Sequence, residues 1–131
     1  MAPSPGTYRI DTQEGIVYIS GTEIASLDEW TRFLDGILAD PDFRPGFGLI
    51  SDRRNMQVTP PAGYARDMAE RLVARRERLR GSHWAMVVNS TVSYGLGRMI
   101  ELSIEDAGLE MRVFNDYDEG LRWVRAQTRR P

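Results

Sequence analysis

The feature that most constrains the fold is a regular alternation of short apolar runs with longer segments of helical period. Three runs, Phe47–Ser51, Trp84–Val88 and Met111–Phe114, each follow an amphipathic segment and have the length of a strand. Alternating strands and helices are joined by crossovers, which makes the strands parallel and covers the sheet with helices. Two earlier runs, Tyr8–Asp11 and Ile16–Ser20, flank a Gly-containing turn and predict a β-hairpin. The sequence therefore predicts an α/β fold: a mixed sheet of four to five strands, in which parallel β-α units follow the hairpin, flanked by helices.

Each predicted helix begins at a residue that can cap its exposed N–H groups. Ser26 with Glu29 forms a capping-box pattern, and Thr59 before two prolines is a favourable start for a second helix that reaches residue 80. The predicted caps are Ser26, Thr59, either Ser90 or Ser93, and Asp116, and the third helix is predicted to end at Gly108.

The 131 residues predict one domain. We expect a disordered lead-in over 1–6, a single α/β domain over 7–126 and a frayed tail over 127–131. The first residues lack the basic and apolar regions of a signal peptide, and no apolar run approaches the ~20 residues that span a bilayer. These features predict a cytoplasmic protein.

Absent residue types exclude several kinds of chemistry. The sequence has no cysteine and one histidine, His83, which excludes thiol nucleophiles, thiolate metal sites and multi-histidine clusters. All 17 basic residues are arginine, which excludes Schiff-base lysines and the Walker lysine. The net charge of −2 predicts no general attraction to nucleic acid. We expect no cofactor and no nucleic-acid partner.

The first candidate site is the charged loop that follows the strand at Phe47–Ser51. Ligands of open α/β sheets bind beyond the carboxyl ends of the strands, and Asp52, Arg53 and Arg54 lie there. Paired arginines can fork onto a phosphate or carboxylate. Alternatively, Asp52 caps local N–H groups while the arginines are solvated or pair with it.

The second candidate site follows the strand at Trp84–Val88. Ser90, Ser93 and Tyr94 supply hydroxyl groups near a helix N-terminus, where an anion can bind, and Arg98 lies one turn further. The alternative is that Gly95 and Gly97 let this helix pack closely against the sheet. We expect Arg53, Arg98 and the 90–94 loop to meet at one end of the sheet.

Other features favour structural roles. The second helix has an excess of arginine that can meet an acidic partner or an anionic lipid surface, but a solvated, self-paired helix face is the commoner arrangement. His83 is expected at the edge of a strand, and the three tryptophans, Trp30, Trp84 and Trp123, are expected in the core.

Three segments resemble the SpoIIAA-like branch of the STAS domains, which are related to CRAL-TRIO lipid carriers. They are Asp52–Arg53 after the first parallel strand, Ser93–Met99 at a helix start, and the ending Val113–Val124. The resemblance covers about residues 7 to 126 and implies a non-enzymatic module, with lipid or membrane association suggested for some members. The family's phosphorylated Asp-Ser pair is absent, and only Thr59 lies at a comparable position. We expect Thr59 to be a structural cap that is not phosphorylated.

Three functions remain open at this point. The leading hypothesis is a non-enzymatic STAS-like module that binds a small anionic or lipid-like ligand, or a protein partner, through Asp52, Arg53, Arg54, Ser90, Ser93, Tyr94 and Arg98. The rival is a small enzyme in which Asp52 and Tyr94 or Ser93 form an acid–base pair beside an arginine anion clamp. The third is an oligomerisation domain. Homodimer formation and peripheral membrane contact stay open.

Overall fold

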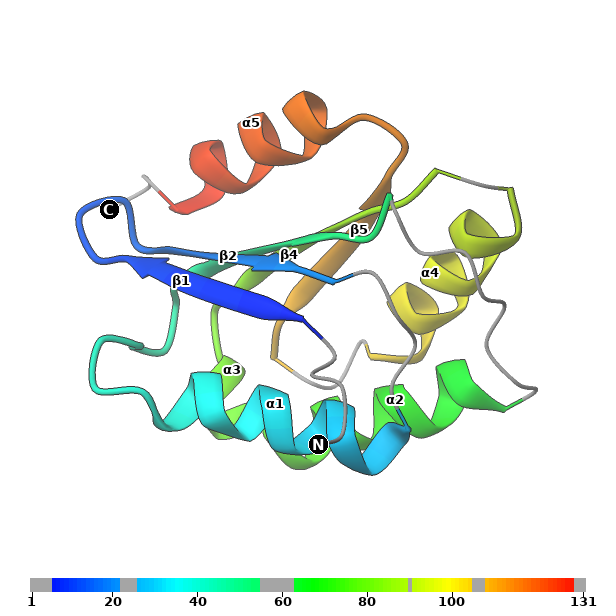
Figure 1. Cartoon of the computed structure of the whole chain (residues 1–131), viewed down its shortest axis with the longest axis horizontal. Helices are drawn as coiled ribbons and strands as arrows, with labels where there is room; N and C mark the ends of the chain where they lie inside the picture. The colour runs from blue at the N-terminus through cyan, green and yellow to red at the C-terminus, as the bar shows by residue number, and fades with distance from the viewer. Residues whose placement is uncertain (1–5, 22–25, 55–62, 90, 105–107, 129–131) are drawn as a thin grey trace.

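The computed structural model describes residues 6–21, 26–54, 63–89, 91–104 and 108–128. Strands and helices alternate along the chain after an initial hairpin (Figure 1). Their order is β1 (Thr7–Asp11), β2 (Ile16–Ser20), α1 (Leu27–Ala39), β3 (Gly48–Asp52), α2 (Tyr64–Ala74), α3 (Arg76–Leu79), β4 (His83–Val87), α4 (Thr91–Ser103), β5 (Glu110–Phe114) and α5 (Tyr117–Thr128).

The five strands form one mixed sheet in the order β1-β2-β3-β4-β5. The first two strands pair antiparallel, and each later strand pairs parallel with the one before it. The predicted α/β class and mixed sheet are therefore confirmed. The strands predicted at Phe47–Ser51 and Trp84–Val88 each lie one residue away from their expected bounds, because pairing rather than apolar character decides where a ladder ends.

This sequential strand order decides which face of the sheet each helix covers. The parallel crossovers all advance in one direction, and right-handed crossovers that advance in one direction place their helices on one face. Figure 1 shows α1, α2, α3 and α4 on one side of the sheet, with α5 alone on the other. One face is thus covered by several helices and the opposite face by one.

Two apolar clusters fill the spaces on the two sides of the sheet. The larger cluster joins α1–α4 to Val17, Leu49, Trp84 and Met111 of the strands. The smaller cluster joins Val124 of α5 to alternate strand residues, Ile16, Ile50, Ala85 and Val87. The period of two along each strand separates these two sets.

Helix α5 lies close to the middle of the sheet and contacts β3 and β4 most extensively. A Cβ atom at Gly48 in β3 would lie 2.5 Å from Cγ1 of Val124, so the glycine allows this approach. A helix with its side chains is about 10–12 Å wide, whereas neighbouring strands are about 4.8 Å apart. One helix therefore cannot cover five strands, and the outer part of the β1–β2 hairpin is left uncovered on this face.

The second and third helices differ from their predicted bounds. The second begins at Tyr64 with Gly63 as its N-cap, not at Thr59, which lies outside the described residues. Gly63 has a φ of 83° and provides no side-chain cap. The helix is also interrupted at Arg75, so the segment predicted to run to residue 80 consists of α2 and α3. Helix α4 ends at Ser103, before the predicted end at Gly108.

Other predictions about single residues have mixed outcomes. The cap at Ser26 is confirmed, because its Oγ accepts a hydrogen bond from the Glu29 N–H at 3.1 Å, and Asp116 accepts one from Glu119 N–H at 3.2 Å. Helix α5 continues through Thr128, so part of the expected frayed tail is helical.

The aromatic residues also differ from one another. Trp30 and Trp84 are buried and stack in the core, as predicted, with ring centroids 6.5 Å apart. Trp123 is only partly buried, and it packs over β4 and β5 against His83 and Phe114 at the margin of the smaller apolar cluster. His83 is the first residue of β4, where it pairs with Glu110 of β5, and the pairing of β4 with β3 begins one residue later at Trp84. No helix within the described ranges is both long and apolar enough to cross a membrane.

Candidate functional site

A groove lies on the α5 face of the sheet, where that helix leaves β1 and β2 uncovered. Its volume is about 280 Å³, just below the range of about 300–1,000 Å³ that is typical of small-molecule sites. It opens beside the carboxyl ends of β2 and β3, the edge at which open α/β sheets bind ligands. The residues that line it are Thr7, Tyr8, Arg9, Tyr18, Ile19, Ser20, Asp52 and Tyr117.

The floor of the groove is a row of polar residues from three neighbouring strands. Thr7 pairs with Ser20 across the hairpin, and Ser20 pairs with Asp52 across the parallel ladder. Paired residues point to the same face of a sheet, so two hydroxyl groups and a carboxylate lie side by side. Tyr8 and Ile19 point the other way and pack in the larger apolar cluster.

Asp52 is held at this floor by the arginine two residues along. Arg54 Nε donates to Asp52 Oδ1 at 2.9 Å, and Arg54 Nη2 donates to Oδ2 at 2.8 Å. The Arg54 N–H also donates to Oδ1 at 3.1 Å. These hydrogen bonds hold the pKa of Asp52 below its ordinary value, although partial burial opposes the shift.

Two tyrosine rings in the groove each lie under a guanidinium group. Arg9 lies 4.1 Å from the centroid of the Tyr18 ring, and Arg54 lies 4.9 Å from that of Tyr117. A guanidinium stacked on a ring keeps its edge N–H groups available to an anion. Burial, assisted by the nearby Asp52 carboxylate, raises the pKa of Tyr117, so its hydroxyl is a neutral donor.

A second acidic residue, Glu14, is paired beside Tyr18, outside the residues that line the groove. Tyr18 donates its hydroxyl hydrogen to Glu14, and Arg125 Nε donates to the other oxygen of Glu14 at 2.8 Å. Burial and the bond to Glu14 raise the pKa of Tyr18. Arg9, in contrast, contacts no carboxylate in the described ranges of the chain. Its guanidinium group is thus available to a ligand in the groove.

Arg53 points away from this groove, although it lies between Asp52 and Arg54. Its N–H donates to the Val87 carbonyl at 2.8 Å, and its side chain lies beside Trp30 and Phe33 on the α1 face. Burial without a carboxylate partner among the described residues lowers the pKa of Arg53. The cavity there measures about 10 Å³, which is room for one water molecule. Arg53 and Arg54 therefore cannot clamp one ligand together.

Arg98 also lies apart from Asp52. It donates to Glu101 Oε1 at 2.8 Å, and Glu101 Oε2 accepts the Val113 N–H at 3.2 Å. This arrangement occupies the outer edge of β5 on the α4 side of the sheet. Asp52 faces α5, so the expectation that Arg98 and Asp52 share one site disagrees with the structure.

The two predicted loops nevertheless lie side by side. The Asn89 side-chain amide donates to the Arg54 carbonyl, which joins the segment after β4 to the segment after β3. Ser90 lies outside the described residues. Ser93 lies within α4 rather than capping it, and its side chain is also outside the described part. Tyr94 is on the exposed side of α4, and no described contact joins it to Asp52.

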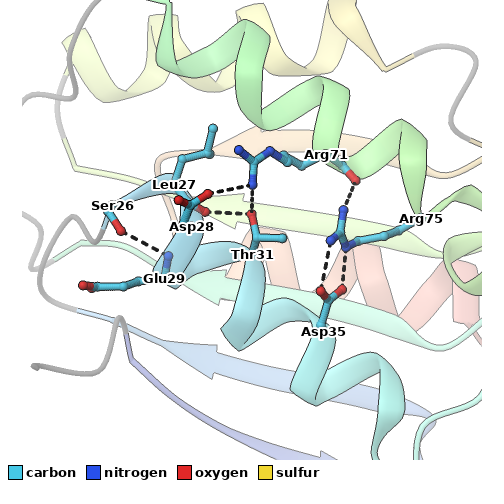
Figure 2. A network of polar contacts seen from close by, with 8 residues as sticks. All are labelled: Ser26, Leu27, Asp28, Glu29, Thr31, Asp35, Arg71 and Arg75. Carbon is cyan, nitrogen blue, oxygen red and sulfur yellow. Dashed lines mark hydrogen bonds and ion pairs between the residues drawn. The ribbon is translucent and has the colours of Figure 1, made fainter.

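Half of the six arginines between residues 66 and 80 hold α1. Figure 2 shows Arg71 reaching Asp28 and Thr31, while Arg75 forks onto Asp35. Arg78 donates to the Leu38 carbonyl at 2.6 Å. These contacts are made with α1 and not with the acidic residues of the same helix, so they differ from the self-paired face expected from the sequence, and they leave a smaller basic surface than the sequence suggests.

The sequence reasoning missed the residues of the hairpin that line the groove. Thr7 and Arg9 alternate in β1, as do Tyr18 and Ser20 in β2, so the period of two would have placed them on one face. The strand order was the missing information, because it decides which face a single helix covers. No family model matches the sequence, and neither the curated proteins nor the solved structures contain a match. The groove itself is therefore the basis for assigning a function.

Proposed function

We propose that this chain is a non-enzymatic, STAS-like binding module that holds a small anionic ligand in the groove between the β1–β2 hairpin and α5. The observation that carries this proposal is Arg9, whose guanidinium faces the groove and meets no carboxylate among the described residues. The element order and the sequence resemblance support the STAS-like part of the proposal. We also propose a cytoplasmic location for the module.

The charges around the groove favour an anion. Arg54 is paired with Asp52 and Arg125 with Glu14, whereas Arg9 forms no ion pair with a described residue. Arg9 and Arg125 both lie close enough to Tyr117 to lower its pKa against the larger effect of burial. An anion placed between Arg9 and Tyr117 therefore receives charge-assisted hydrogen bonds, which are about twice as strong as neutral ones.

The enzyme hypothesis receives less support from the same geometry. Both oxygens of Asp52 accept hydrogen bonds from Arg54, and the lowered pKa makes the carboxylate a weak base. Tyr94, its expected partner, lies on α4, on the other side of the sheet. Asp52 acts in this proposal by fixing Arg54 over Tyr117.

A titration with inorganic phosphate at low ionic strength tests the proposal. We expect amide chemical shifts to move in residues 7–9, 18–20 and 52–54 of the ¹⁵N-labelled protein. The variant Arg9→Gln should weaken binding by about tenfold or more, because a hydrogen bond to a charged group contributes about 1.5–3 kcal/mol. Arg32→Gln, on the exposed side of α1, is the matched control and should bind like the wild type. Equal binding by Arg9→Gln and wild type would contradict the proposal.

A further inference from the structure

We infer that the ligand of this groove is a small polyhydroxylated anion, of the sugar phosphate or sugar acid class. This inference rests on the proposed function, because Arg9 would hold the anionic group. Its new element is the floor, where the hydroxyls of Thr7 and Ser20 and the carboxylate of Asp52 form a row. An anion without hydroxyl groups would leave this row unused.

The hydroxyl groups of the row are free to bind. No described side chain or backbone group forms a hydrogen bond with the hydroxyl of Thr7 or Ser20, and both residues are exposed. A hydroxyl group is both a donor and an acceptor, so each matches the hydroxyl of a polyol in either direction.

Asp52 has one acceptor position left after Arg54 is bound. A carboxylate has about four lone-pair sites. Oδ1 accepts two hydrogen bonds, from the N–H and Nε of Arg54, and Oδ2 accepts one, from Nη2. The second site on Oδ2 can accept a hydrogen bond from a ligand hydroxyl, which a carboxylate or a fully ionised phosphate ester cannot donate. The free acceptor position on Asp52 therefore favours a ligand that carries a hydroxyl group as a hydrogen-bond donor.

The spacing of the row suits a ligand with several hydroxyls. Neighbouring strands are about 4.8 Å apart, so an oxygen midway between two floor groups can lie within about 2.8 Å of both. Such an oxygen donates to one floor group and accepts from the next. One ligand hydroxyl can therefore form hydrogen bonds with both Thr7 and Ser20, and an adjacent one with both Ser20 and Asp52.

The walls argue against an amphiphilic ligand. The side chains that face the groove are those of Thr7, Arg9, Tyr18, Ser20, Asp52 and Tyr117, and each has a polar group. The rings of Tyr18 and Tyr117 are partly covered by guanidinium groups. Among the described residues, an acyl chain would meet no aliphatic side chain that faces the groove, whereas a polyol can form hydrogen bonds with the hydroxyl groups and with Asp52.

Paired ligands that differ in hydroxyl content test the inference. Glucose 6-phosphate is compared with propyl phosphate, and gluconate with butyrate, by the same amide-shift titration of the full chain. We expect the hydroxylated member of at least one pair to bind about tenfold more tightly, since two or more neutral hydrogen bonds are added. The pair with the larger ratio identifies the anionic group as phosphate or carboxylate.

Substitutions in the floor of the groove test whether its hydroxyl groups cause the difference in affinity between the hydroxylated and the plain anion. Thr7→Val with Ser20→Ala should reduce the ratio to about threefold or less while binding of propyl phosphate or butyrate is unchanged. Thr12→Val, in the hairpin turn, is the control and should retain the full ratio. A ratio near one in wild type, or a large ratio unaffected by the floor variants, would overturn the inference while leaving the Arg9 proposal intact. Failure of every anion to bind would overturn both.

Discussion

At the scale of single residues, buried hydroxyl groups in the core are of two kinds. The Ser51 Oγ accepts a hydrogen bond from the Trp84 indole N–H at 2.8 Å in a buried environment. The Ser82 Oγ is buried without any partner among the described residues. The Ser51 hydroxyl therefore supplies the hydrogen-bond acceptor of the buried Trp84 N–H. The Ser82 hydroxyl loses its contact with water and gains no hydrogen bond from a described residue in exchange.

This difference predicts opposite outcomes for one substitution at two sites. Ser51→Ala should lower the free energy of unfolding by about 1–3 kcal/mol, because it leaves the buried N–H of Trp84 without an acceptor. Ser82→Ala is the matched control and should be neutral or slightly stabilising, because it removes an unsatisfied group. Urea denaturation measures both. A larger loss for Ser82→Ala than for Ser51→Ala would contradict this account.

At the scale of secondary-structure elements, the approach of α4 to β5 depends on one of two neighbouring glycines. A Cβ at Gly97 would lie 2.8 Å from Cγ2 and 3.0 Å from Cβ of Val113, whereas a Cβ at Gly95 would meet nothing within 4 Å. The sequence suggested close packing for both glycines. The structure assigns that role to Gly97 alone.

Alanine substitutions at the two positions should therefore shift stability in opposite directions. Gly97→Ala should destabilise the protein by about 1–3 kcal/mol, because the stiff Val113 side chain and the helix must move apart. Gly95→Ala, at an exposed helical position, should stabilise it by up to about 1 kcal/mol through helix propensity. Thermal unfolding of both variants checks the pair. Stabilisation by Gly97→Ala would show that α4 does not press on β5.

The contact of α1 with α2 should give stability a dependence on acidic pH. Arg75 lowers the pKa of Asp35 mainly through the side-chain hydrogen bonds drawn in Figure 2. A lowered pKa means that the stabilisation is present above the unfolded pKa of about 3.9 and is lost as pH falls through the folded pKa. Because Asp35 is half exposed, the contribution should stay below about 1 kcal/mol.

The variant Asp35→Asn tests this contact. At pH 7 its free energy of unfolding should be slightly lower than that of wild type, and the difference should shrink below about pH 4. Glu70→Gln, also exposed and without a described ion pair, is the control and should show no such convergence. A difference that is constant from pH 7 to pH 3 would contradict the role of the Asp35 charge.

At the scale of the whole molecule, local patterns predict the elements but not their arrangement around the sheet. The alternation of strands with helices predicted the parallel pairing, and the caps at Ser26 and Asp116 followed from side-chain chemistry. The opposite directions of Arg53 and Arg54 follow from the same period of two that separates the core clusters. Each of these features depends on residues that are close together in the sequence, so it can be predicted from the sequence.

The strand order depends on which edge of the growing sheet each new strand joins, and no local pattern specifies this. The choice of one edge every time places α1–α4 together and leaves α5 alone. The groove is a result of that arrangement, so the loop-based reasoning found Asp52 but not Arg9. Helix α2 was misplaced for a related reason, since Thr59–Pro60 is a good local start but the helix begins at Tyr64.

The solitary position of α5 also has a consequence for synthesis of the chain. Residues 117–128 are synthesised after all five strands, so we expect α5 to be the last element to dock on the sheet. Until then, Ile16, Ile50, Ala85 and Val87 face water as one continuous apolar strip. We therefore expect a folding stage at which helices cover one face of the sheet while the other face still exposes apolar side chains. The time between the emergence of β5 and the docking of Val124 sets the interval in which a chaperone, or a second nascent chain, can bind that strip.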